Sequence, residues 1–234
     1  LTPRAADFAS LAADATVRWP SRIMTTQHFP IPSTAETHDC IIRLLFGYDG
    51  SYLASAVRLA YSDLSRTIHG IAVADPSGEI RATAAQVLQR AIVAVAAGAA
   101  SQASFDRWHE ATCVALSGVY SSAGFTCFYI GHAQKWVNMA VKYCALLDDR
   151  AVPSGGSFFS FGHVPIDSLV INALSRTSPS LPPQLRFPAW SRISSYSDYM
   201  AFQVWVRDTF PGSTPLSVEF FLWQSEAAAL AKAT

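Results

Sequence analysis

The chain has 234 residues, of which 50% are hydrophobic, 12% aromatic and 15% charged. This composition supplies one large core or two small lobes, and we expect a single globular unit over residues 1–234. The 17 basic and 17 acidic residues cancel to a formal charge of zero. That balance excludes a protein that coats DNA through a basic tail, so nucleic acid would have to bind at a local basic site.

The cysteines and the apolar runs exclude further classes of protein. Cys40, Cys113, Cys127 and Cys144 lie far apart without a CxxC pair, so we expect no bound metal and no disulfide framework. The longest apolar run, residues 91–100, is shorter than the ~20 residues that span a bilayer, and it predicts a buried helix. We expect no membrane contact. Because no signal-peptide pattern is visible, the expected location is cytoplasmic.

Helix signals recur along the chain and strand signals hardly occur, which predicts an all-α fold of about nine or ten helices. A threonine followed by proline marks a helix start at residues 2–3 and again at 214–215, since the hydroxyl caps free amides and proline needs no donor there. In chain order, apolar residues at helical spacing predict helices over residues 79–98, 104–120 and 133–147, and a capping pattern at 195–198 opens a helix that ends at 211–212.

One predicted helix carries polar residues that packing does not explain. Within residues 131–144, Lys135, Asn138 and Lys142 align at i, i+3 and i+7, opposite an apolar stripe. Two of the three lysines of the chain lie here. The pattern fits either a solvated helix face or a basic binding edge.

A second motif follows in residues 163–170, where Asp167 stands between Val-Pro-Ile and an apolar helix. Aspartate before a helix is a preferred N-cap. A glycine four residues before a lysine at a helix start, followed by this Val-Pro-Ile-Asp-Ser-x-Val segment, resembles the helix-hairpin-helix DNA glycosylases. The resemblance covers roughly residues 124–174, and the long interval between the two motifs is most similar to the archaeal 8-oxoguanine glycosylase branch.

The resemblance implies a role for each matching residue. Gly131 matches the hairpin glycine, Lys135 the lysine that forms an imine with the sugar, and Asp167 the essential acid. The chain departs from the family where Ala133 replaces the second hairpin glycine. Backbone amides at Gly131, His132 and Ala133, together with Lys142, would hold a DNA phosphate.

The same resemblance predicts a base pocket. In the archaeal branch an acid and a tryptophan one helical turn apart line this pocket near the C-terminus, and Glu219 and Trp223 have the same spacing. Gln27 would take the part of the family's N-terminal glutamine. Further candidates for stacking on the base are Trp19, Trp108 and Trp190.

The resemblance also implies a two-lobed helical fold with a cleft between the lobes. Residues 1–50 and 166–234 would form one lobe, and residues 51–165, with the hairpin and Lys135, would form the other. The expected function is a DNA glycosylase, a hydrolase of base excision with or without lyase activity. Its target would be an 8-oxoguanine-like base in DNA repair or a hypermodified phage base in antiviral defence.

This chemistry needs the residue types that the motifs supply. Positive charge develops on the sugar as the base leaves, and the carboxylate of Asp167 would stabilise it. Water or the amine of Lys135 would then attack the sugar. The partner would be DNA with one flipped-out base, and we expect a monomer without a nucleotide or other cofactor.

Two alternatives remain open at this stage. One is an all-α ribonuclease of the HEPN type, whose arginine and histidine would be Arg22 and His28. The other is a non-catalytic helical binding protein, in which Lys135 and Asp167 would be unconnected surface and cap residues. No HExxH, GxSxG or GxGxxG motif occurs, which argues against metal hydrolases, α/β hydrolases and nucleotide cofactors.

Overall fold

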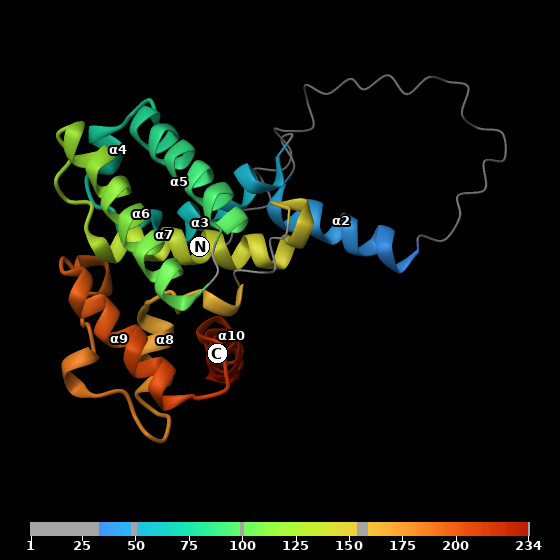
Figure 1. Cartoon of the computed structure of the whole chain (residues 1–234), viewed down its shortest axis with the longest axis vertical. Helices are drawn as coiled ribbons and strands as arrows, with labels where there is room; N and C mark the ends of the chain where they lie inside the picture. Colours follow the sequence, from blue (N-terminus) through green and yellow to red (C-terminus); the bar gives the residue numbers. More distant parts are fainter. Residues whose placement is uncertain (1–32, 48–50, 99–100, 154–158, 234) are drawn as a thin grey trace. The chain divides into compact units, whose positions relative to one another are not determined.

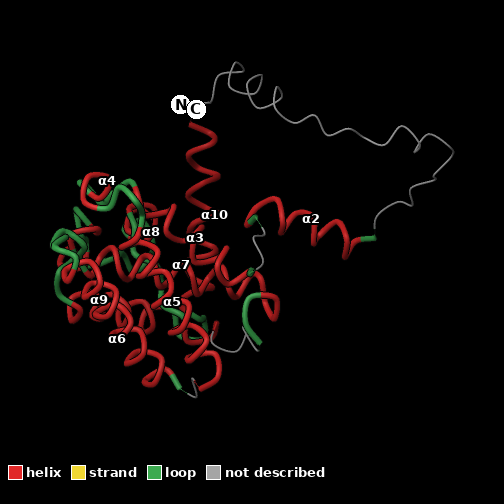
Figure 2. The backbone as a smooth tube through the Cα atoms, turned by 90° about the horizontal axis from the view of Figure 1, so that it is seen from above, coloured by secondary structure: helices red, strands yellow, loops and turns green. Residues whose placement is uncertain are grey.

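The computed structural model describes residues 33–47, 51–98, 101–153 and 159–233, and these ranges contain nine α-helices, four short 3-10 helices and no strand (Figures 1 and 2). The prediction of an all-α fold is therefore confirmed. The elements are α2 (Thr34–Phe46), α3 (Tyr52–Ser65), α4 (Ile71–Ala74), α5 (Glu79–Gly98), α6 (Gln102–Ser122), α7 (Ile130–Leu147), η1 (Asp148–Arg150), η2 (Phe159–Phe161), α8 (Ser168–Leu174), η3 (Pro183–Leu185), η4 (Trp190–Arg192), α9 (Tyr196–Thr209) and α10 (Pro215–Ala233).

The chain divides after Ile41 into two units. In the described part of the first unit, Ser33 caps the start of α2, because its hydroxyl oxygen accepts from the amide of Glu36 at 3.2 Å. Residues 42–234 form the second unit, which holds the last turn of α2 and all the other helices. The division into lobes at residues 50 and 165 stays a prediction.

Helix α7 is the centre of the second unit. It is buried from Gly131 to Val141 and packs against α3 and α6. The indole nitrogen of Trp136 donates to the carbonyl of Val57 in α3 at 2.9 Å, which fixes the two helices against each other. Figure 1 shows α7 between α3, α5 and α6 on one side and α8, α9 and α10 on the other. Residues on the α8–α10 side of α7 therefore lie between two groups of helices.

The sequence predicted the helix positions well and one burial pattern poorly. Helix α5 has the predicted bounds, whereas α6 and α7 begin two and three residues earlier than expected. The run at residues 91–98 is buried on one side only, since Ile92 and Val95 are buried while Val93 is 52% exposed. The predicted start at residues 2–3 lies outside the described residues.

Two capping predictions are confirmed in the C-terminal part. Ser195 caps α9 and accepts from the amide of Asp198 at 3.2 Å. Thr214 precedes Pro215 at the start of α10 and accepts from the amide of Ser217 at 3.2 Å. A hydroxyl side chain at this position satisfies an amide that has no partner within the helix.

Two further features concern the part of the chain that the structure describes, namely membrane-spanning helices and clusters of metal ligands. None of the helices in this part is both long and apolar enough to cross a bilayer. The described His, Cys, Asp and Glu side chains do not gather in groups of three or more that could hold a metal ion. Each of the four cysteines is a free thiol.

Candidate active site

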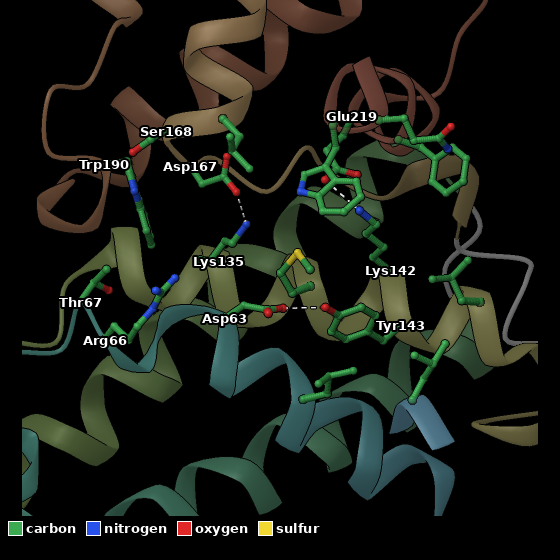
Figure 3. A pocket seen from close by; sticks show the side chains of 18 of the residues that line it. Asp63, Arg66, Thr67, Lys135, Lys142, Tyr143, Asp167, Ser168, Trp190 and Glu219 are labelled. Carbon is green, nitrogen blue, oxygen red and sulfur yellow. Dashed lines mark hydrogen bonds and ion pairs between the residues drawn. The ribbon is translucent and has the colours of Figure 1, made fainter. Parts of the chain in front are cut away.

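A pocket of about 940 Å³ opens between α3, α7, η4 and α10 (Figure 3). Its walls carry charged and aromatic side chains from segments that are far apart in the sequence. Figure 3 shows the two lysines of α7 between side chains from α3 on one side and Asp167 and Glu219 on the other. The lining residues are Leu45, Phe46, Leu59, Asp63, Arg66, Thr67, Lys135, Met139, Lys142, Tyr143, Leu146, Asp167, Ser168, Leu169, Trp190, Glu219, Phe220, Trp223 and Gln224.

Lys135 and Asp167 meet in this pocket. The Nζ atom of Lys135 lies 2.6 Å from Oδ2 of Asp167, and the two side chains are only 6% and 16% exposed. The other oxygen, Oδ1, accepts from the amide of Val170 at 2.9 Å, so Asp167 is also the predicted N-cap of α8. The lysine is therefore neither a solvated surface residue nor unconnected from the acid.

The segment before Asp167 is held extended by two buried glutamines. Gln203 of α9 accepts from the amide of Val164 at 2.9 Å and donates to its carbonyl at 2.8 Å. Gln134 of α7 does the same for Ile166, at 3.1 and 3.0 Å. Each side-chain amide thus pairs with a backbone as a neighbouring strand would. Since Gln134 precedes Lys135, one helix carries the lysine and also fixes the segment that presents the acid.

Lys142 pairs with Glu219 on the opposite wall. Its Nζ atom donates to both carboxylate oxygens, at 2.9 and 2.7 Å, and Glu219 is almost completely buried. The same Nζ lies 5.8 Å from the centre of the Trp223 ring, within the range of a cation–π contact. The predicted base-pocket pair Glu219 and Trp223 therefore lines the same pocket as Lys135 and Asp167.

The tryptophans proposed for stacking have different positions. Trp223 is 46% exposed at the pocket, and Trp190 lines the pocket from η4. Trp108 lies outside it and donates to the carbonyl of Ala91, which joins α6 to α5. Trp19 lies outside the described residues, as do Gln27, Arg22 and His28.

The phosphate site predicted at the start of α7 has no free backbone donor. The amide of Gly131 donates to the carbonyl of Ile193 at 2.8 Å, and the amides of His132 and Ala133 both donate to Tyr129. A Cβ atom at Gly131 would overlap the carbonyl oxygen of Trp190, so the glycine is needed for close packing of η4. Prediction and structure differ here because η4 covers the helix start. Lys142, the fourth predicted phosphate ligand, is paired with Glu219 instead.

His132 joins the start of α7 to the end of α3. Its Nδ1 accepts from the amide of Tyr129 at 3.1 Å, and its Nε2 lies 3.1 Å from the carbonyl oxygen of Thr67. A carbonyl requires a donor, so Nε2 carries the proton of a neutral ring. Burial lowers the pKa of His132 to about 4, which keeps it neutral near pH 7.

Asp63 and Tyr143 form a third polar pair in the pocket, which the sequence did not reveal. The hydroxyl of Tyr143 donates to Oδ2 of Asp63 at 2.7 Å. Burial raises the pKa of Tyr143, and the hydrogen bond to Asp63 raises it further, so the hydroxyl remains a donor. Tyr143 directly follows Lys142 in the sequence and could have been noticed for that reason. Its partner Asp63 lies in α3, however, and no local sequence pattern connects the two residues.

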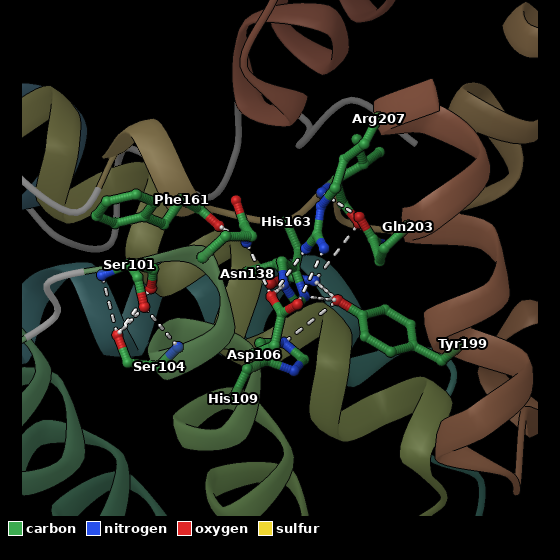
Figure 4. A network of polar contacts seen from close by, with 12 residues as sticks. Ser101, Ser104, Asp106, His109, Asn138, Phe161, His163, Tyr199, Gln203 and Arg207 are labelled. Carbon is green, nitrogen blue, oxygen red and sulfur yellow. Dashed lines mark hydrogen bonds and ion pairs between the residues drawn. The ribbon is translucent and has the colours of Figure 1, made fainter. Parts of the chain in front are cut away.

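A polar network joins α6, α7, α9 and the segment before Asp167 (Figure 4). The Nδ1 atom of His163 lies 2.7 Å from the hydroxyl oxygen of Tyr199, and its Nε2 atom lies 2.7 Å from Oδ1 of Asp106. Arg207 binds both oxygens of Asp106. The hydroxyl of Tyr199 accepts from Asn138, so the network extends to α7.

The network sets the charge state of its members. Burial would raise the pKa of Asp106, but hydrogen bonds from His163, Arg207 and Gln102 lower it further than burial raises it, and the carboxyl stays ionised. Burial lowers the pKa of His163 and of His109. The network therefore combines one fixed carboxylate with neutral rings, and it anchors the segment that leads to Asp167.

Comparisons with family models, with curated proteins and with solved structures found no match to this chain. The arrangement of the site is thus the basis for any functional proposal.

Proposed function

We propose that this protein is a DNA glycosylase that removes an altered base and leaves an abasic site. The observation that carries the proposal is the 2.6 Å contact between Lys135 Nζ and Asp167 Oδ2 in the wall of a pocket of about 940 Å³. An amine and a carboxylate this close can act on the same carbon atom. The pocket volume lies within the roughly 300–1,000 Å³ of ligand sites, which suits a flipped-out nucleotide.

Each of the two residues has its own role in this chemistry. As the bond between the sugar C1′ and the base nitrogen breaks, its electron pair leaves with the base and positive charge develops on the sugar. The carboxylate of Asp167 stabilises this charge. In the lyase route the neutral amine of Lys135 bonds to C1′, and the proton that its nitrogen then sheds passes to Asp167. The C1′–O4′ bond breaks next, O4′ takes that proton together with the electron pair, and the opened sugar is left as an imine. Elimination from that imine cuts the strand, which is the lyase activity; attack by water gives base loss alone.

The proposal includes the two-lobed arrangement and the class of target. Support for the lobes comes from the pocket itself, which is lined by α3 from one group of helices and by α10 from the other. The target is an 8-oxoguanine-like base, as in DNA repair, or a hypermodified base of phage DNA, as in antiviral defence. Exposed aromatic rings at the pocket, Trp223 and Phe220, suit stacking on either.

The test is a panel of duplexes, each with one altered base, together with modified phage DNA, assayed for abasic sites. Asp167→Asn should lower base release by about a hundredfold or more, since it removes the charge that stabilises the developing cation but keeps a capping side chain. Lys135→Gln should abolish the covalent adduct trapped by borohydride and leave slower base release by water.

Matched variants control this test. Asp208→Asn changes an exposed acid of α9, and Lys232→Gln changes the third lysine of the chain; both should behave like the parent. Melting and DNA binding of Asp167→Asn are measured alongside, because the variant leaves Lys135 without its partner. If Asp167→Asn releases bases as fast as the parent, or if no DNA in the panel loses a base, the proposal is wrong. RNA cleavage that depends on Arg22 and His28 would favour the ribonuclease alternative.

A further inference from the structure

Three carboxylates line the pocket, and in two of them both oxygens already accept a hydrogen bond from the protein. Asp167 has one oxygen on Val170 and the other on Lys135, and both oxygens of Glu219 accept from Lys142. Asp63 differs: Oδ2 accepts from Tyr143, and Oδ1 accepts no hydrogen bond from any residue that the structure describes. Asp63 thus retains an unused acceptor on the pocket wall.

The acceptor is held in a defined orientation. Tyr143 cannot turn freely, because its ring packs edge-on against Phe46 with the centres 5.5 Å apart. Its hydroxyl keeps its proton, as described above, and directs it at Oδ2 of Asp63. One oxygen of the carboxylate is therefore fixed by the protein, and the other leaves an open acceptor position on a side chain that lines the pocket.

We propose that Asp63, oriented by Tyr143, reads the hydrogen-bonding edge of the flipped base and selects bases with adjacent ring N–H and exocyclic amino donors. This inference rests on the proposed glycosylase function. An ionised carboxylate only accepts hydrogen bonds. The guanine edge offers two neighbouring donors to it. The edges of adenine and cytosine place a ring acceptor beside the amino group, and thymine flanks its N–H with two carbonyls, so each of these presents an oxygen or nitrogen lone pair to the carboxylate.

This assignment narrows the target without specifying its modification. Guanines altered on the imidazole side keep the same donor edge, whether the change is oxidation at C8 or replacement of N7 by a carbon that carries a larger substituent. Such bases fit both the repair and the antiviral version of the proposed function. Glu219, by contrast, already accepts from Lys142 at both oxygens, and for this reason we assign the edge to Asp63.

The test uses two duplexes that differ only in the 2-amino group of one base, 8-oxoguanine and 8-oxohypoxanthine. The parent protein should release 8-oxoguanine faster by about tenfold or more, since the second base leaves one acceptor unpaired. Asp63→Asn should bring the ratio close to one, because an amide offers a donor where the carboxylate accepted. Tyr143→Phe keeps the ring against Phe46 and should reduce the ratio partially, and Asp208→Asn should leave it unchanged.

An unchanged ratio in Asp63→Asn overturns the inference while leaving the glycosylase proposal intact. If neither duplex loses its base, the full panel described above decides the glycosylase proposal, and binding decides the inference separately. Quenching of tryptophan fluorescence by 2′-deoxyguanosine and 2′-deoxyinosine then compares the same two edges. A preference for 2′-deoxyguanosine that Asp63→Asn abolishes supports the inference; equal binding of the two, or no binding, overturns it.

Discussion

Lys135 enters the pocket from a helix that is buried along the part that carries it, and its ammonium group has one carboxylate as its partner. A charge in this position must be paired, because transfer from water to a protein interior costs several kcal/mol. The pairing with Asp167 meets that requirement and also brings a nucleophile and an acid together. The lysines of the pocket are thus each paired with a carboxylate. Within each pair, the two side chains differ in how exposed they are to water.

Lys142 and Glu219 allow this difference to be measured. Glu219 is 1% exposed and Lys142 is 12% exposed, so the lysine reaches water more easily than the glutamate does. Lys142→Met should therefore cost more stability, about 3 kcal/mol, than Glu219→Gln, which leaves a lysine that can turn outward. Urea unfolding of the two variants and of the double variant checks this. Equal losses in the two single variants, with no recovery in the double variant, would contradict the prediction.

Trp223 separates a binding role from a packing role. Because its ring is 46% exposed, Trp223→Ala should change the free energy of unfolding by less than about 1 kcal/mol. If the ring stacks on a flipped base, the same variant should weaken binding of lesion DNA by ~1 to 3 kcal/mol. Trp136→Ala is the matched comparison, since the fully buried indole of α7 should cost ~3 to 5 kcal/mol of stability. A large loss of stability in Trp223→Ala would show a packing residue.

Among the elements, the extended segment before α8 decides where the acid stands. Its backbone groups pair with Gln203 at Val164 and with Gln134 at Ile166, and Pro165 between them has no amide to satisfy. The two glutamines make similar contacts at different distances along the chain from Asp167. They therefore provide a matched pair for separating stability from positioning.

Gln134→Leu and Gln203→Leu should each lower the stability by about 2 kcal/mol or more, because each leaves a buried amide and carbonyl unpaired. Their effects on base release should differ. Gln134 holds the residue next to Asp167. We therefore expect Gln134→Leu to lower kcat by about tenfold more than Gln203→Leu does, with both variants saturated with substrate. Urea unfolding and single-turnover kinetics give the two readouts. Equal effects of the two variants on kcat would assign both glutamines to stability alone.

Local sequence patterns were sufficient for most helix positions but not for all of the site. Ser195 and Thr214 act as caps over three residues, and short-range contacts of this kind are visible in a sequence. The meeting of Lys135 with Asp167 was expected from the resemblance alone. Nothing near Gly131 in the sequence indicates that Ile193 uses its amide, and nothing near Tyr143 indicates Asp63, because both contacts join segments that only the tertiary fold brings together.

At the scale of the whole molecule, the polar interior predicts sensitivity to acid. Burial lowers the pKa of His132 to about 4 and lowers the pKa values of His109 and His163, while the pKa of Asp106 lies below its usual range. All four shifts have the same sign. In each case the unfolded chain binds a proton at a higher pH than the folded chain does. Stability is therefore fully present above the ordinary pKa of each group and is lost as the pH falls toward the folded value.

For His132 the window lies between its ordinary pKa of 6.5 and about 4. A shift of this size corresponds to about 3 kcal/mol of stability that is present above pH 6.5 and lost as the pH falls to 4. Urea unfolding between about pH 7.5 and 4.5 should show a steep fall in the free energy of unfolding. His132→Gln should be less stable at the upper end, since it loses the contacts to Tyr129 and Thr67, and its curve should be shallower because the titrating ring is gone. His38→Gln, in an exposed part of α2, should keep the parent slope. A parent slope retained in His132→Gln would assign the acid sensitivity to Asp106 and the two histidines around Tyr199 instead.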